Sequence, residues 1–134
     1  MEILQTNIWK VEVLEDQIMF ITWLESAADM EDETFKLHLI LFTNLLKEHN
    51  CNKFLVDTRY GHITMNVDIQ EWHDLQIVPI YLELGITKIG FVLPEDIFIS
   101  TSLEQTFEED KGKLLNTKYF DNIEKALVWF KEEN

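Results

Sequence analysis

The architecture of this chain is set by residues 18–57, which read IMFITWLESAADMEDETFKLHLILFTNLLKEHNCNKFLVD. Residues 18–24 are apolar on both alternating faces, the pattern of a strand that is covered on both sides. Residues 53–57 are nearly all apolar, which is typical of a parallel strand in the interior of a sheet. A longer run with helical periodicity separates them. The stretch therefore predicts a strand, a helix and a second strand in succession.

The segment between these two strands, residues 27–50, carries the clearest helical signal in the chain. Large apolar residues recur there at positions i, i+4, i+7 and i+11, namely Phe35, Leu39, Phe42 and Leu46. Leu41 and Leu45 lie alongside them and make the apolar stripe broad. Acidic residues precede this stripe, and Lys47 and His49 follow it, an arrangement that complements the dipole of a helix. We expect one amphipathic helix with the stripe as its buried face.

The N-terminal neighbour of this unit is a second strand. Residues 8–24 are rich in Val, Ile, Phe, Trp and Thr and are interrupted only at residues 15–17. This composition, with its single polar break, predicts two antiparallel strands joined by a tight turn.

A second helical pattern follows residue 57 and passes through Ile69, Trp72 and Leu75 or Leu82. Pro79 interrupts the pattern, and we expect a kink or a break there because proline lacks the amide that a helix interior needs. Gly85 stands where a left-handed cap would end the helix.

The rest of the chain repeats the alternation. Residues 86–93 and 114–120 predict two further strands, and capping-box patterns at residues 101–104 and 121–124 predict the starts of two helices. The predicted fold is a single α/β domain with a mixed sheet of about five strands. It has an N-terminal antiparallel hairpin, then βαβ crossovers, with helices packed on at least one face.

Composition limits the partners that this domain can have. The chain has 134 residues, 25 of them acidic and 11 basic, for a net charge of −14. This length suits one domain, residues 1–134, and a 46% hydrophobic content supports a core. Because so negative a surface repels phosphate groups, we expect no nucleic-acid partner. No apolar run approaches the ~20 residues that cross a bilayer, so no membrane span is predicted.

The compartment is predicted from two features. The single cysteine, Cys51, cannot form an internal disulfide, which fits a reducing environment. Residues 1–7 lack the basic start and the apolar core of a signal peptide. We therefore expect a cytoplasmic protein.

Three local patterns resemble the STAS-like domains related to bacterial anti-sigma-factor antagonists, in particular small stand-alone members of unassigned role. They are the strand ending in Asp57, Thr58 and Arg59; residues 72–79, leading to LGITKIGFV at 84–92; and YFDNIEKALVWF at 119–130. The resemblance implies the same α/β plan. It also implies binding roles, since similar folds bind nucleotides, lipids or other proteins.

In the sigma-regulating members of that family, a Ser or Thr after the strand-end Asp is phosphorylated by a partner kinase. Thr58 is the nearest counterpart in this chain. The family usually starts a helix at once after this residue, whereas here residues 59–66 intervene before the helical pattern resumes. This departure argues against a phosphorylation switch at Thr58.

Polar and aromatic residues gather after the strand at 53–57: Asp57, Thr58, Arg59, Tyr60, His62, Trp72, His73 and Asp74. Open α/β sheets bind ligands at the carboxyl ends of their strands. Arg59 could hold a carboxylate or phosphate, and Trp72 or Tyr60 could form an aromatic wall. The ligand-binding candidates are Asp57, Thr58, Arg59, His62, Trp72 and His73. The alternative is structural: Asp57 caps the turn, Arg59 neutralises an acid and Trp72 joins the core.

No catalytic, metal or cofactor motif accompanies this cluster. Asp57, His62, Asp68 and His73 have no recognised ligand spacing, so no metal site is predicted. The four glycines stand singly, so no glycine-rich loop can cradle a phosphate. Cys51 is expected to be a small apolar filler. We expect no cofactor and no enzymatic activity, with acid–base chemistry by Asp57, His62 and His73 as an alternative.

The leading functional prediction is a non-enzymatic regulatory or protein-binding module, with a homodimer as one form of that binding. It is based on the two-sided apolar run at residues 18–24 and on the lack of a catalytic constellation. The alternative is a small-molecule or lipid-binding carrier. An excess of large apolar residues suggests it: Phe20, Trp23, Phe42, Trp72, Phe91, Phe98 and Phe107.

Overall fold

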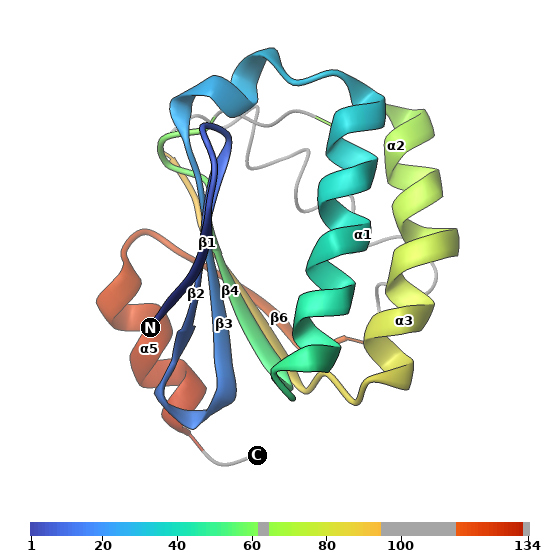
Figure 1. The fold of residues 1–134 in the computed structure, drawn as a ribbon. Helices are drawn as coiled ribbons and strands as arrows, with labels where there is room; N and C mark the ends of the chain where they lie inside the picture. The colour runs from blue at the N-terminus through green and yellow to red at the C-terminus, as the bar shows by residue number, and fades with distance from the viewer. Residues whose placement is uncertain (62–64, 95–114, 133–134) are drawn as a thin grey trace.

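The computed structural model describes residues 1–61, 65–94 and 115–132 (Figure 1). Within them one mixed sheet has the strand order β1-β2-β3-β4-β5-β6, the same as the order along the chain. The first three strands are antiparallel, and each later strand is parallel to the one before it. The strands are β1 Glu2–Gln5, β2 Trp9–Leu14, β3 Ile18–Trp23, β4 Lys53–Asp57, β5 Lys88–Val92 and β6 Thr117–Phe120.

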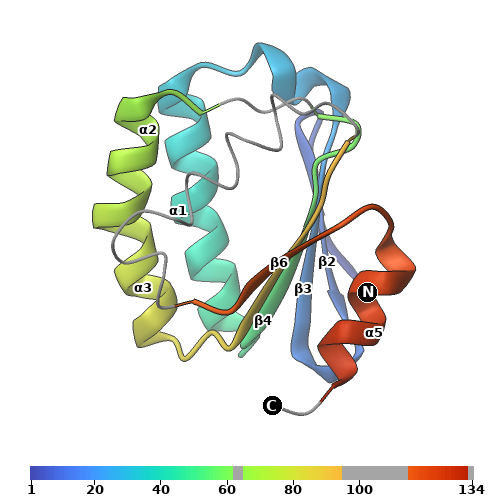
Figure 2. The same cartoon turned by 180° about the vertical axis from the view of Figure 1, so that it is seen from behind.

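Helices cover both faces of this sheet. On one face lie α1 (Asp32–Glu48) and a continuous helix made of α2 (Val67–Trp72), the π-helical turn η3 (His73–Ile77) and α3 (Val78–Glu83). On the other face lies α5 (Ile123–Lys131), as the view from behind also shows (Figure 2). The predicted α/β fold class is confirmed. The helix predicted to start at residues 101–104 lies outside the described residues.

The predicted hairpin is confirmed, with the short turn η1 (Glu15–Gln17) between β2 and β3. Asp16 and Gln17 have positive φ angles of 63° and 61°, which turn the chain sharply. The edge strand β1 was not predicted. It is only four residues long, and just two of them, Ile3 and Leu4, are partly buried.

The two apolar faces of β3 are both covered within the chain. Met19, Ile21 and Trp23 point into the larger cluster of buried side chains, which α1 and the α2–α3 helix help to form. Ile18 points to the other face and is buried in a smaller cluster with residues of α5, and Phe20 packs against that cluster. The two-sided pattern predicted from residues 18–24 is therefore explained by helices of the same chain.

The helix that contains Pro79 does not break. It widens just before the proline, where the Val78 amide donates to the His73 carbonyl, five residues back. A proline cannot donate to the carbonyl four residues earlier, and its ring would clash with that carbonyl in a regular α-helix. The π-helical turn accommodates both constraints. Beyond it, Gly85 ends the helix with a φ of 74°, which confirms the predicted cap.

Two residues of β5 hold helix α5 in place: Gly90 lies under the ring of Phe130, and Lys88 binds the C-terminal end of the helix. Gly90 leaves room for the ring of Phe130, since an added Cβ would lie 3.1 Å from Phe130 Cζ. Lys88, only 2% exposed, donates from Nζ to the carbonyls of Trp129 and Glu132, at 2.7 Å each. The cation thus binds carbonyls at the C-terminal end of the helix, where the helix dipole favours positive charge.

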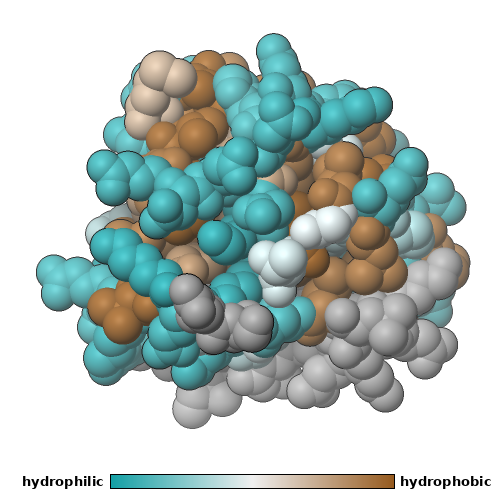
Figure 3. All heavy atoms as spheres, turned by 90° about the horizontal axis from the view of Figure 1, so that it is seen from below, coloured by the Kyte–Doolittle hydropathy of each residue, from teal (hydrophilic) through white to brown (hydrophobic). Residues whose placement is uncertain are grey.

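The surface is mostly polar but not uniformly so. Figure 3, seen from the end of the molecule where α1 and α3 finish, shows hydrophobic atoms between larger hydrophilic areas. Several large apolar side chains are exposed on the helices, among them Leu37, Ile40 and Leu41 of α1, Leu75 of η3 and Val128 of α5.

Candidate functional site

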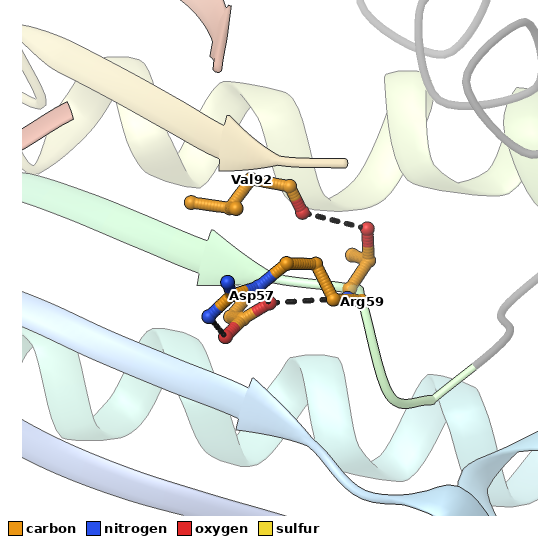
Figure 4. Close-up of polar contacts among 4 residues, drawn as sticks. Asp57, Arg59 and Val92 are labelled. Atoms are coloured by element: carbon orange, nitrogen blue, oxygen red, sulfur yellow. Dashed lines mark hydrogen bonds and ion pairs between the residues drawn. The ribbon is translucent and has the colours of Figure 1, made fainter. Parts of the chain in front are cut away.

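The polar cluster after β4 is built around a buried ion pair. Asp57 ends β4 and is 1% exposed. Its carboxylate accepts three hydrogen bonds from Arg59: from the backbone amide and Nε at 3.0 Å, and from Nη2 at 2.9 Å (Figure 4). The hydrogen bond to Asp57 is the main cause that raises the pKa of the Arg59 guanidinium. This geometry is a turn cap combined with a bidentate ion pair.

Neighbouring residues of the cluster are also engaged. The Thr58 hydroxyl is buried and donates to the Val92 carbonyl at 3.0 Å, which ties the end of β4 to β5. The guanidinium of Arg59 lies 5.2 Å from the ring centroid of Tyr60, which is largely exposed. A kinase could reach the Thr58 hydroxyl only after this end of the sheet had opened.

Trp72 and His73 follow each other in sequence but take part in different surroundings. Trp72 is half-buried, and the Lys36 ammonium of α1 lies 5.5 Å from its ring centroid. His73 is buried, with its ring 5.8 Å from that of Tyr81. Burial lowers the pKa of the His73 imidazole to about 4, because the charged form would lose its hydration.

A cavity of about 50 Å³ lies between the sheet and the helices α1 and η3. Aromatic side chains dominate its lining, and Thr58 and His73 add polar atoms. Pockets for drug-sized ligands measure roughly 300–1,000 Å³, whereas about 10–15 Å³ is enough for one water. The cavity as it stands has the size for water-sized occupants only.

A wider hollow of about 600 Å³ lies on the other face of the sheet, between β6 and α5. Its charged residues are partly committed to one another, since Lys125 pairs with Asp121 at 3.0 Å and Lys118 lies 5.7 Å from the ring centroid of Phe120. The hollow is open to solvent and mixes polar with apolar walls.

Five of the six candidate residues are described by the structure, and they have different surroundings. Asp57, Thr58 and Arg59 lie together at the end of β4, and Thr58 and His73 both line the cavity. Trp72 packs against the main core from a half-buried position and contacts Lys36 on α1, and it is not among the residues that line the cavity. His62 lies outside the described residues.

The prediction that Leu41 belongs to the buried stripe of α1 is wrong, since it is exposed, as are Leu75 and Leu82 of the second helical pattern. Leu37 and Ile40 of α1, also exposed, were not singled out from the sequence. The helix is apolar nearly all round from residue 37 to residue 42, and such a run is normally read as a broad buried face. The signal was present in the spacing, because Leu37, Ile40 and Leu41 are out of phase with the buried stripe of Phe35, Leu39 and Phe42.

Two kinds of site are not formed by the described residues. They contain no group of three or more potential metal ligands. None of the described helices is both long enough and apolar enough to cross a bilayer.

Comparison of the chain with protein-family models, with curated proteins and with solved structures finds no match. The fold and the site thus define a single α/β domain with a mixed sheet and a self-contained polar cluster. Membership of the STAS-like family stays a prediction.

Proposed function

We propose that this chain is a non-enzymatic, regulatory protein-binding module. The observation that carries the proposal is the solvent face of α1, where Leu37, Ile40 and Leu41 are 66%, 46% and 41% exposed. Single exposed apolar residues are ordinary, but three within little more than one helical turn form a contiguous apolar surface. Such surfaces mark interaction sites on soluble domains.

The polar cluster after β4 supports a binding role over catalysis. A general acid or base must be within hydrogen-bond reach of its substrate. Both carboxylate oxygens of Asp57 instead accept hydrogen bonds from Arg59. The guanidinium of Arg59 is likewise directed at this internal partner instead of a ligand. The resemblance to STAS-like domains, some of which act by binding other proteins, favours the same function.

A homodimer is one form that this binding can take. Its original motivation, the two-sided apolar strand, is weaker now that α1 and α5 cover the two faces of β3. Light scattering of the wild type and of the α1 variants tests for the homodimer. The cytoplasm is the compartment we propose for the protein, where its one cysteine, Cys51, would stay reduced.

The alternative, a carrier of an apolar small molecule, draws on the aromatic cavity. At about 50 Å³ the cavity would have to enlarge severalfold before it took a lipid or a metabolite of ordinary size. Native mass spectrometry of freshly purified protein tests this alternative. A retained apolar ligand would favour the carrier, and a mass equal to that of the chain alone would count against it.

The protein-binding proposal is tested by affinity capture with matched variants. The test variant carries Leu37→Gln, Ile40→Gln and Leu41→Gln, and the control carries Val128→Gln on the opposite side of the sheet, where Val128 is 63% exposed. We expect at least one protein to be retained by the wild type and by the control but lost by the test variant. Identical sets of captured proteins for all three chains would refute the proposal.

A further inference from the structure

The apolar surface of α1 continues toward the neighbouring helix. Leu37 lies about 200° round α1 from the buried Phe35, so it points away from the sheet. Ile40 and Leu41 flank it on either side. On the adjacent η3, Leu75 is 59% exposed. We call Leu37, Ile40, Leu41 and Leu75 the α1 face.

Two contacts set the relative height of the helices that carry this face. Asn66 Nδ2 donates to Asp32 Oδ2 at 3.1 Å, and Lys36 lies 5.5 Å from the ring centroid of Trp72. Figure 1 shows α1 and the α2–α3 helix side by side and descending together from these contacts. Ile40 is one turn beyond Lys36, and Leu75 follows Trp72 by three residues, so the two lie at similar heights.

Acidic residues border the α1 face. On α1, Glu33 lies one turn before Leu37, and Glu48 lies about three turns after Leu37 on the same side of the helix. On η3, Leu75 is preceded by Glu71, one turn earlier. All three carboxylates are exposed. Two cations of α1 lie beside these carboxylates: Lys36, which is shared between Glu33 at 3.5 Å and the ring of Trp72, and the exposed Lys47, about two turns beyond Ile40. An apolar centre with an acidic rim fits a ligand of the opposite kind.

We propose that the α1 face binds a basic amphipathic helix of a partner protein, whose apolar stripe covers the leucines while Lys or Arg residues meet the rim. Helix-in-groove recognition uses anchors at i, i+3 or i+4, and i+7, a spacing that matches an apolar surface of one to two turns. The inference rests on the proposed protein-binding function and names the class of its partner.

Charge distinguishes this occupant from a second copy of the chain. Each copy has a net charge of −14, so two copies repel each other. In a two-fold pairing of α1 with α1, antiparallel helices would bring Glu33 of one copy near Glu48 of the other. A basic helix gains from the same charges, both in its rate of encounter and in its specificity.

The direct test uses three synthetic peptides and the full chain. The first peptide is acetylated and has about 18 residues, with Leu at helical spacing and Lys elsewhere. This length is enough for an isolated helix to form in water. The second has the same composition in scrambled order, and the third has Glu in place of Lys. Amide shifts in two-dimensional NMR report both the affinity and the place of binding.

We expect the basic amphipathic helix to bind and to shift amides of residues 33–48 and 71–75. Leu37→Gln alone, at the most exposed position, should weaken binding about 3-fold, and the triple glutamine variant at least about 10-fold. Glu33→Gln with Glu48→Gln should weaken binding at low salt and flatten its salt dependence. Val128→Gln should leave the affinity unchanged.

Three outcomes would overturn the inference, besides a failure of the basic helix to bind. The scrambled peptide could bind as tightly as the amphipathic one, the shifts could map to α5, or light scattering could show a dimer that the triple variant abolishes. The last result would make a second copy the occupant. If capture of a protein depends on the α1 face but the basic helix does not bind, the proposed function survives and the partner class is wrong.

Discussion

His73 is a buried imidazole at the start of η3, between the cavity and the ring of Tyr81. Burial of an ionisable group favours its neutral form, and here it lowers the pKa of the imidazole from 6.5 to about 4. The same effect raises the pKa of Tyr81, whose phenol is equally buried. Both side chains therefore contribute to the core as neutral groups at neutral pH.

This buried histidine makes stability depend on pH. Because the folded pKa lies below the unfolded one, the unfolded chain binds more protons between pH 6.5 and about 4. The free energy of unfolding contributed by His73 is complete above pH 6.5 and falls as the pH drops toward 4, by up to ~1.4 kcal/mol per pH unit. Urea unfolding of the wild type and of His73→Gln across this range measures the effect.

Carboxylates also titrate in this range, so the difference between the two chains is the readout. We expect the variant to be less stable at pH 7 and to lose less stability on acidification. His49→Gln, at a half-buried position near the end of α1, is the control. Parallel pH profiles for the wild type and His73→Gln would show that His73 is not the titrating group.

The residues after β4 show what sequence could and could not establish about the candidate site. Asp57, Thr58 and Arg59 were placed correctly at the carboxyl end of a parallel strand, because the strand before them is clearly apolar. The interaction partners of these residues could not be predicted from sequence, since Arg59 could equally have faced a ligand. Only the three-dimensional geometry directs its guanidinium onto Asp57, as in the structural alternative.

Among the elements, α5 depends most on its contacts. A helix of nine residues is too short to be stable alone, so packing and end contacts must hold it. Asn122 caps its first turn by accepting from the Lys125 amide at 2.9 Å. Lys88 binds the carbonyls at its other end, as described above.

Replacing Lys88 with methionine should weaken this anchor. Lys88→Met keeps much of the side-chain volume but removes both hydrogen bonds from the ammonium, and the Trp129 carbonyl keeps only its bond from the Glu132 amide. Each lost hydrogen bond to a charged group costs about 1.5–3 kcal/mol, so we expect a loss of about 3 kcal/mol in the free energy of unfolding. Chemical denaturation measures it.

The matched control is Lys131→Met, which also removes a cation from the last turn of α5 but at an exposed position. Surface changes of this kind usually stay within about 0.5 kcal/mol. Equal effects of the two substitutions would mean that general charge at the helix end matters and that the buried contacts of Lys88 do not.

The elements that were predicted well are those whose burial is periodic. α1 and α5 bury apolar residues at helical spacing, and β3, β4 and β5 have dense apolar runs between polar turns. β1 was missed because an edge strand that is half exposed has little pattern to detect. The turn η3 was missed because Pro79 predicts a disturbance of the helix but not the form that it takes.

At the scale of the whole molecule, the net charge of −14 opposes compaction. The ion pairs of the described residues offset little of it, since those on Lys10, Lys36 and Lys125 are at or near the surface, where water and salt screen the attraction. Much of the acidic surface therefore repels itself.

Added salt should stabilise the protein. Raising NaCl from about 10 mM to about 150 mM shortens the screening length from about 30 Å to about 8 Å. We expect the midpoint of thermal unfolding to rise by about 5 °C, which corresponds to roughly 1 kcal/mol for a domain of this size. Circular dichroism measures the midpoint. Further salt should add little, and a midpoint that stays flat or falls over the first step would contradict self-repulsion.

The sheet is laid down in the order of the chain, each strand pairing with its immediate predecessor. During synthesis the N-terminal hairpin can form first, and each later strand can then pair with the edge of the sheet that is already formed. The helix α5, which covers one face of the sheet, leaves the ribosome after all six strands. Until then Ile18, Leu55 and Val92, which α5 helps to bury, face water. A nascent chain stalled before α5 thus exposes a hydrophobic face of the sheet, which chaperones and proteases can recognise.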